Sequence, residues 1–286
     1  MAAAVAITVD GRELEVAPGT SLREACGKAG VEVPTLCFTA NFTPANACRL
    51  CVVELEGART LVPACSRAVE PGMRIQTGSD RVRLSRRLVL EFLASSVDLS
   101  IATELKSLLA EYGAQPERFT AEAATVAQPV KVDNELYVRD YSKCVLCYRC
   151  VQACGSEAQN TFAIWVAGRG FGARIATEFD AALTDSACVY CGNCIEVCPT
   201  GALMFKTEFD LREAGTWAEE RQHTTTTICH YRGAGCNHDL VIPHNQHVRV
   251  NSPPSSDITH ATLCINTPPR PHPPTGTLLL SPSPPI

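Results

Sequence analysis

The sequence predicts an α+β chain in which several small domains follow one another. Three observations support this prediction: a strand–turn–strand–helix pattern opens the chain, a helical stretch without Cys or His follows it, and two cysteine runs of identical spacing lie in the second half. The chain has 286 residues, 16 of them cysteine, and a formal net charge of −5. This charge argues against a nucleic-acid-binding protein, which typically presents a basic surface.

Residues 1–82 are expected to form a mixed α/β domain. Val5–Val9 and Glu13–Val16 have the composition of strands, and Asp10-Gly11 between them is typical of a hairpin turn. Ser21 with Glu24 forms a capping box that predicts the start of a short helix. The domain also contains a block of four cysteines, namely Cys37, Cys48, Cys51 and Cys65.

This block predicts a [2Fe–2S] site, although its first gap is longer than in the plant-type spacing. A structural Zn(Cys)4 site is the alternative, because zinc also takes four thiolates with C-x2-C spacing. Cys26 lies within the predicted helix and has no partner at ligand spacing. We expect it to be a buried small hydrophobic residue.

Residues 83–135 are expected to form a helical spacer, because apolar residues recur there at helical intervals. From Val82 to Lys143 the chain has neither Cys nor His. The spacer therefore offers no soft metal ligand.

Residues 136–209 contain the strongest motif. The two runs are Cys144-x2-Cys147-x2-Cys150-x3-Cys154 and Cys188-x2-Cys191-x2-Cys194-x3-Cys198. Pro199 completes the bacterial ferredoxin pattern, in which the fourth cysteine of each run ligates the other cluster. The predicted [4Fe–4S] ligand sets are therefore Cys144, Cys147, Cys150 and Cys198 for one cluster, and Cys188, Cys191, Cys194 and Cys154 for the other. Zinc sites do not ordinarily use such crossed runs.

The C-terminal part holds three further cysteines in residues 222–265, which are Cys229, Cys236 and Cys264. Arg232 stands where a fourth ligand is expected, and a guanidinium that stays protonated is a poor ligand. This third [4Fe–4S] site is therefore expected to be defective. Residues 266–286 include eight prolines and predict a disordered tail.

The order of these parts resembles the iron–sulfur region of NAD-dependent, molybdenum-containing formate dehydrogenases. It is similar also to the large iron–sulfur subunit of complex I and to subunits of NAD-linked hydrogenases. The motif Tyr137-Val138-Arg139-Asp140 and the stretch Pro199–Leu203 look like this family. The resemblance implies a β-grasp ferredoxin fold for the first domain and a partial molybdenum/tungsten bis-pterin-type segment at 222–265. Members commonly bind an extra cluster after the first domain, and the ligand-free spacer implies that this cluster is absent.

The resemblance implies an electron-transfer subunit of a formate dehydrogenase-type oxidoreductase, with no catalytic residue and no complete substrate site on this chain. One [2Fe–2S] and two [4Fe–4S] clusters would relay electrons between a pterin-binding catalytic subunit and flavin/NAD-binding diaphorase subunits. The alternatives are the corresponding subunit of an NAD-linked hydrogenase or complex I-like NADH dehydrogenase, an iron–sulfur sensor, and a truncated remnant. No signal peptide or run of about 18 apolar residues is present, so we expect a cytoplasmic protein without membrane insertion.

Overall fold

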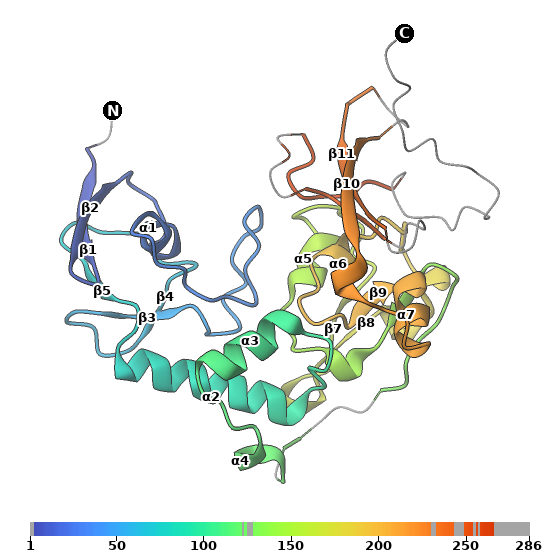
Figure 1. Cartoon of the computed structure of the whole chain (residues 1–286), viewed down its shortest axis with the longest axis horizontal. Coiled ribbons are helices and arrows are strands. Elements are labelled where there is room, and N and C mark those ends of the chain that lie inside the picture. The colour runs from blue at the N-terminus through green and yellow to red at the C-terminus, as the bar shows by residue number, and fades with distance from the viewer. Residues whose placement is uncertain are drawn as a thin grey trace.

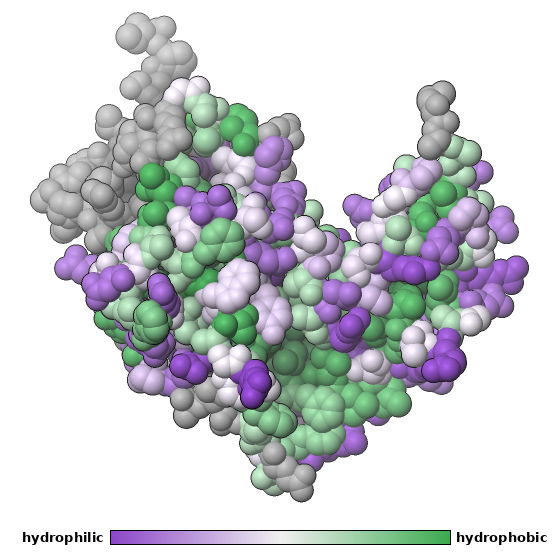
Figure 2. Space-filling view, turned by 180° about the vertical axis from the view of Figure 1, so that it is seen from behind, coloured by the Kyte–Doolittle hydropathy of each residue, from purple (hydrophilic) through white to green (hydrophobic). Residues whose placement is uncertain are grey.

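The computed structural model of the chain describes residues 3–121, 123–124, 128–229, 233–242, 249–253, 256 and 258–265. The N-terminal sheet forms one lobe, and the cysteine-rich second half forms the other (Figure 1). Helices α2 (Asp80–Ser96) and α3 (Thr103–Glu111) run between the two lobes. In the space-filling view an open notch separates the lobes on the side opposite these helices (Figure 2).

The N-terminal lobe is a five-stranded mixed sheet with the strand order β2-β1-β5-β3-β4. Its strands are β1 (Val5–Val9), β2 (Arg12–Val16), β3 (Val52–Leu55), β4 (Val62–Pro63) and β5 (Arg74–Gln76). Strands β1 and β5 are parallel, and the other neighbouring pairs are antiparallel. Asp10 and Gly11 both have positive φ, as the turn between β1 and β2 requires.

Helix α1 (Leu22–Lys28) begins at the predicted capping box. The backbone N–H of Glu24 donates to the Ser21 hydroxyl at 3.2 Å, and the Ser21 N–H donates to the Glu24 carboxylate at 2.9 Å. Cys26 lies in the core of this lobe with no exposed area, which confirms the prediction that it is buried.

The spacer is helical, but it is not one continuous helix. Helix α2 begins at Asp80, three residues before the predicted boundary, because Ser79 caps it. Val97 is extended and ends the helix, and α3 and the short α4 (Glu117–Thr120) follow. Leu90 and Leu105 are fully buried in a cluster that also includes Leu36 and Leu50 of the N-terminal lobe. The spacer thus packs directly against the segment that carries Cys37 and Cys48.

Replacing Leu105 by alanine should destabilise this junction by about 2–5 kcal/mol, because the change removes fully buried methyl groups and leaves a cavity. Chemical denaturation followed by far-UV circular dichroism measures the loss. Leu84 is 46% exposed on α2, so Leu84→Ala is the matched control and should change stability by less than about 1 kcal/mol. Equal effects of the two changes would show that Leu105 does not anchor the spacer.

The second lobe is centred on the antiparallel pair β6 (Tyr137–Arg139) and β9 (Leu203–Phe205). The chain segment that connects these two strands contains the short helices α5 (Arg149–Cys154) and α6 (Asn193–Glu196). It also contains the hairpin of β7 (Trp165–Ala167) with β8 (Arg174–Ala176). Short 3-10 turns complete the connections in the described part of the chain, at Tyr141–Lys143, Gly170–Gly172, Glu178–Asp180, Leu183–Asp185 and Glu219–Arg221.

Helix α7 (Lys206–Glu213) follows β9 directly, and Gly215 with positive φ lies just beyond its end. The chain then forms an antiparallel three-stranded sheet of β10 (His223–Ile228), β11 (Asn237–Ile242) and β12 (Arg249–Asn251). The predicted tail at 266–286 lies outside the described residues. In the part of the chain that the structure describes, no helix has the length and apolar character needed to cross a bilayer.

Candidate iron–sulfur sites

The two cysteine runs repeat one backbone conformation. Leu146 and Tyr190 occupy the same position between the first two cysteines of their runs, with φ of 51° and 58°. Tyr148 and Gly192, which follow the second cysteine, have φ of 65° and 82°. Residues other than glycine rarely adopt this left-handed backbone conformation. Its recurrence at matching positions indicates that the spacing between the cysteines, rather than the identity of the intervening residues, determines the loop.

This conformation directs backbone N–H groups at the sulfur atoms. In the first run, hydrogen bonds from the N–H groups of Leu146 and Arg149 act to lower the pKa values of Cys144 and Cys147. Tyr190 and Asn193 do the same for Cys188 and Cys191 in the second run. Hydrogen bonds of this kind favour a thiolate, which is the form that binds iron.

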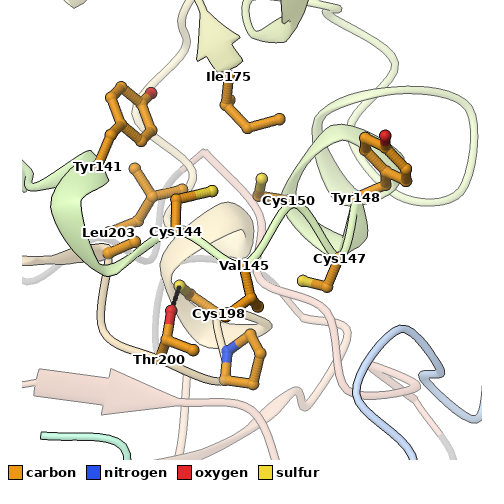
Figure 3. Close-up of a pocket in the computed structure, with 12 residues that line it drawn as sticks. Tyr141, Cys144, Val145, Cys147, Tyr148, Cys150, Ile175, Cys198, Thr200 and Leu203 are labelled. Atoms are coloured by element: carbon orange, nitrogen blue, oxygen red, sulfur yellow. Dashed lines mark hydrogen bonds between the residues drawn. The ribbon is translucent and has the colours of Figure 1, made fainter. Parts of the chain in front are cut away.

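Cys198 of the second run lies with the first three cysteines of the first run. These four residues line one small cavity together with Tyr141, Ile175 and Leu203, and Figure 3 shows their side chains gathered there. The Thr200 hydroxyl lies 3.9 Å from the Cys198 sulfur. The structure therefore brings together the first predicted set of Cys144, Cys147, Cys150 and Cys198.

Cys154 stands in the reciprocal position, near the second run. Its charge acts to raise the pKa values of Cys188, Cys191 and Cys194, in addition to the larger effect of burial on each. The Cys154 sulfur lies 3.4 Å from the Thr161 hydroxyl. Of the second predicted set, Cys154, Cys188 and Cys194 pack against one apolar cluster of this lobe. That Cys154 completes this set stays a prediction.

The chemistry of these sets fits an iron–sulfur cluster. Burial raises the pKa of Cys144 to about 11 and that of Cys147 to about 12, so the thiolates need positive charge beside them, which iron supplies. Among the described residues, no three His, Cys, Asp or Glu side chains are gathered closely enough to hold one metal ion. In a [4Fe–4S] cluster each of the four thiolates binds a different iron, so the ligands stand farther apart than those of a single ion.

The N-terminal block is positioned by the sheet. Cys51 precedes β3 and Cys65 follows β4, and a bond from the N–H of Ala64 to the carbonyl of Cys51 at 3.1 Å holds them adjacent. Their sulfur atoms lie 3.3 Å apart, and the hydrogen bond with Cys65 lowers the pKa of Cys51 to about 7.

The other two cysteines of the block form a second pair. The N–H of Cys48 donates to the sulfur of Cys37 at 3.4 Å, and the hydrogen bond between the two side chains lowers the pKa of Cys48 to about 5. All four predicted residues of the block thus lie in two contacting pairs.

The ten-residue loop between Cys37 and Cys48 contacts the first cysteine run. The Arg149 Nε donates to the Thr39 hydroxyl at 2.8 Å, and the Gln152 amide donates to the carbonyl of Thr43 at 2.5 Å. Phe42 is buried against Ala153 and Val197. The sequence alone does not predict these contacts, because Thr39 and Phe42 carry no local motif.

The C-terminal cysteines are only partly described. The N–H of Cys229 donates to the carbonyl of Cys236 at 2.8 Å across the β10–β11 ladder. The residue before Cys264, Leu263, exchanges two hydrogen bonds with the Asn193 side chain, at 2.8 and 2.5 Å. Cys264 therefore follows a segment fixed beside the second cysteine run. Arg232, on which the predicted defect rests, lies outside the described residues.

Two family models match the chain. Residues 2–80 match a 2Fe-2S iron-sulfur cluster binding domain. Residues 135–204 match the ferredoxin-like domain of NADH-quinone oxidoreductase subunit 3. The two matches cover the N-terminal lobe and both cysteine runs.

Curated relatives and a solved structure extend these matches. The chain is 31% identical over 278 residues to the alpha subunit of an NADPH-Fe(3+) oxidoreductase of Geobacter sulfurreducens, which covers 92% of this chain and 30% of that protein. It is 35% identical over 208 residues to NADP-reducing hydrogenase subunit HndD of Solidesulfovibrio fructosivorans, covering 69% of this chain and 35% of that protein. A 78 kDa subunit of the mitochondrial NADH-ubiquinone oxidoreductase of Neurospora crassa is 31% identical over 211 residues, covering 71% of this chain and 28% of that protein.

The solved structure is a crystal structure of NAD+-reducing [NiFe]-hydrogenase in the H2-reduced state. The likeness has a TM-score of 0.63 and 26% identity, and it covers 71% of this chain and 88% of that chain.

These relatives do not show the formate dehydrogenase type that the sequence predicts. They are oxidoreductase subunits of the NADH dehydrogenase and hydrogenase type, and so favour the alternative. The chain spans about a third of the length of the curated relatives it matches. The chain is an iron–sulfur protein that combines a [2Fe–2S] cluster-binding domain with a [4Fe–4S] ferredoxin-like domain of the NADH-quinone oxidoreductase subunit 3 type.

Proposed function

We propose that this chain is an electron-transfer subunit of an oxidoreductase of the NADH:quinone oxidoreductase or NAD-linked hydrogenase type. It would hold one [2Fe–2S] and two [4Fe–4S] clusters and relay electrons to or from a flavin/NAD-binding partner subunit. The observation that carries this proposal is the docking of the Cys37–Cys48 loop on α5, because that contact sets two cluster-binding segments side by side.

The proposed ligands follow the sets described above. The [2Fe–2S] cluster would be held by Cys37, Cys48, Cys51 and Cys65, and the [4Fe–4S] clusters by Cys144, Cys147, Cys150 with Cys198, and by Cys188, Cys191, Cys194 with Cys154. When bound, the clusters supply one-electron redox chemistry. The residues of this chain act as ligands, donate N–H bonds to sulfur, and limit the access of water.

The contacts between the domains support a continuous route. Cys48 packs on the same apolar cluster as Val145, which lies between Cys144 and Cys147. Asp98 of the spacer binds the Lys143 ammonium at 2.8 Å, immediately before the first run. The spacer thus holds the N-terminal lobe against the first run without contributing a ligand of its own.

The proposed function can be tested by mixing this chain with a flavin-containing, NADH-oxidising subunit and adding NADH. We expect NADH to reduce the clusters of this chain only when such a subunit is mixed with it, because the sequence carries no dinucleotide-binding fingerprint. Stopped-flow bleaching of the visible absorption measures the reduction, and a flavin-free preparation of the partner is the control. Failure of the clusters to accept electrons from the reduced flavin subunit would contradict the proposal.

Formate dehydrogenase with a pterin-binding partner is the second candidate. The hairpin that aligns Cys229 with Cys236 favours it, as does the anchoring of Leu263 beside the second run. These contacts would bring a third cluster next to the proposed ligands Cys191 and Cys194. Formate-driven reduction in the presence of a pterin subunit, but not of a hydrogenase subunit, would separate this candidate from the first.

Changing Arg232 to cysteine should create a stable third [4Fe–4S] cluster, raising the iron content by about four per chain. The physical reason is that Cys229, Cys236 and Cys264 give three thiolates, whereas a guanidinium cannot ligate iron. Iron analysis and low-temperature EPR of both proteins measure the gain. Arg221→Cys, in the 3-10 turn Glu219–Arg221 before β10, makes the same substitution away from the ligand position and is the control. An intact third cluster in the unchanged protein would show that the site is not defective.

A further inference from the structure

The Asn193 side chain joins the second cysteine run to the C-terminal segment. Asn193 is the first residue of α6, two positions after Cys191, and only 2% of its area is exposed. Its Nδ2 donates to the carbonyl of Leu263 at 2.8 Å, and its Oδ1 accepts from the N–H of Leu263 at 2.5 Å. Leu263 is buried as well. The amide thus binds both backbone groups of a residue that lies 70 positions away in the sequence.

These two bonds fix the orientation of the amide. A carbonyl can accept only from Nδ2, and an N–H can donate only to Oδ1, so the Leu263 backbone excludes the flipped arrangement. Nδ2 also lies 3.5 Å from the Cys191 sulfur and donates a hydrogen bond to it. In the flipped arrangement Oδ1 would face that sulfur, and two acceptors would meet. Leu263 therefore determines that the Cys191 sulfur faces a donor.

The C-terminal segment is also held at a second point. The Asn41 amide, in the loop of the proposed [2Fe–2S] site, donates to the carbonyl of His260 at 2.6 Å. His260 and Ala261 both have positive φ, 47° and 58°, so the chain turns sharply between its two anchors. Among the described residues, Asn41 and Asn193 thus bind the same short segment, but the bond network of Asn193 alone reaches a cysteine sulfur.

We propose that Asn193 is a positioning residue through which the C-terminal segment raises the reduction potential of the cluster that we assign to Cys188, Cys191 and Cys194. This inference rests on the ligand set of the proposed function. An N–H directed at a ligand sulfur stabilises the negative charge that the cluster gains on reduction. The cluster takes one electron from the reductant, and no proton moves, because the amide keeps both of its hydrogens.

The sign of the change in potential separates this role from packing. Loss of the N–H···S bond makes the reduced, more negative cluster less stable and lowers the potential. A loss of packing admits water, which stabilises the reduced cluster and raises the potential. Leucine branches at Cγ as asparagine does and has no polar side-chain atom. Asn193→Leu therefore removes the hydrogen bonds while it keeps the volume.

EPR-monitored redox titration of the full chain, with dithionite as the reductant, tests the inference. Cys191→Ala first identifies the signal of this cluster by its loss. Asn193→Leu should then lower the midpoint potential of that signal. Asn193→Gln keeps an amide one methylene farther out and should lower the potential less. If Asn193→Leu loses iron altogether, Asn193→Gln carries the test.

Hydrogen–deuterium exchange provides a second readout that does not depend on the potential. In Asn193→Leu the peptide that contains Leu263 should exchange faster than in the unchanged protein, because the Leu263 N–H has lost its acceptor. Equal exchange in the two proteins would show that Asn193 does not hold the segment, and would overturn the positioning role.

Asn41→Leu is the matched control, because it removes the other amide bond to the same segment but no bond to sulfur. It should leave the assigned signal at its original potential. Unchanged or raised potentials in the Asn193 variants, or an equal shift in Asn41→Leu, would overturn the inference alone. Survival of every [4Fe–4S] signal in Cys191→Ala would instead overturn the ligand set, and the inference with it.

Discussion

Replacing Cys198 by alanine should remove the cluster that we propose for Cys144, Cys147 and Cys150, and should leave the cluster proposed for Cys188, Cys191 and Cys194 in place. The expected loss is about four irons per chain together with one of the two [4Fe–4S] signals. The reason is spatial, because Cys198 lines the same cavity as the first-run cysteines although it belongs to the other run. Iron analysis and EPR spectroscopy of the anaerobically prepared variant measure the loss.

Cys194→Ala is the control for this prediction, since Cys194 lies four residues before Cys198 in the same run. It should remove the other [4Fe–4S] signal. If Cys198→Ala and Cys194→Ala abolish the same signal, the cysteines of each run bind one cluster, and the exchange of the fourth ligand is wrong.

Replacing Cys51 by alanine will remove the [2Fe–2S] cluster, about two irons per chain, and will interrupt electron flow between the N-terminal lobe and the rest of the chain. The sulfur of Cys51 is 3.3 Å from that of Cys65, and the backbone bond between Ala64 and Cys51 fixes both. Visible circular dichroism and EPR spectroscopy report the [2Fe–2S] cluster selectively.

Cys26→Ala is the matched control for Cys51→Ala. Both cysteines are buried in the core of the N-terminal lobe, at 0% and 1% exposure, so the two changes remove the same atoms from similar surroundings. Cys26→Ala should keep the full iron content. Loss of the [2Fe–2S] signal in Cys26→Ala alone would place the cluster on a different ligand set.

The sequence predicts local structure well where one short motif contains all the information. The hairpin at Asp10-Gly11 and the capping box at Ser21 are specified by neighbouring residues, and the structure has both. The spacing within each cysteine run likewise determines a tight loop with repeated positive φ. In these segments the interactions join residues a few positions apart, so a pattern in the sequence is sufficient.

Other features depend on contacts that no local pattern records. The apolar stripe of the spacer predicted helix, but not the break at Val97, after which Asp98 turns to bind Lys143. Helix α7 begins at Lys206 and ends at Glu213. It starts where β9 ends, and β9 is fixed by its pairing with β6, which lies far away in the sequence.

The candidate sites show the same division. The cysteines are identifiable by spacing alone, whereas Arg139 is marked in the sequence only as part of a family-like motif. The structure buries it fully, in an ion pair with Asp133. Phe42 carries no signal in the sequence for a similar reason, since its partners Ala153 and Val197 belong to distant segments of the chain.

Iron and acid-labile sulfide per chain, measured on protein reconstituted without oxygen, test the central claim most directly. We expect about ten irons, two from the [2Fe–2S] cluster and four from each [4Fe–4S] cluster, with matching sulfide and EPR signals of both kinds after reduction. Zinc in place of iron, or iron without acid-labile sulfide, would contradict it.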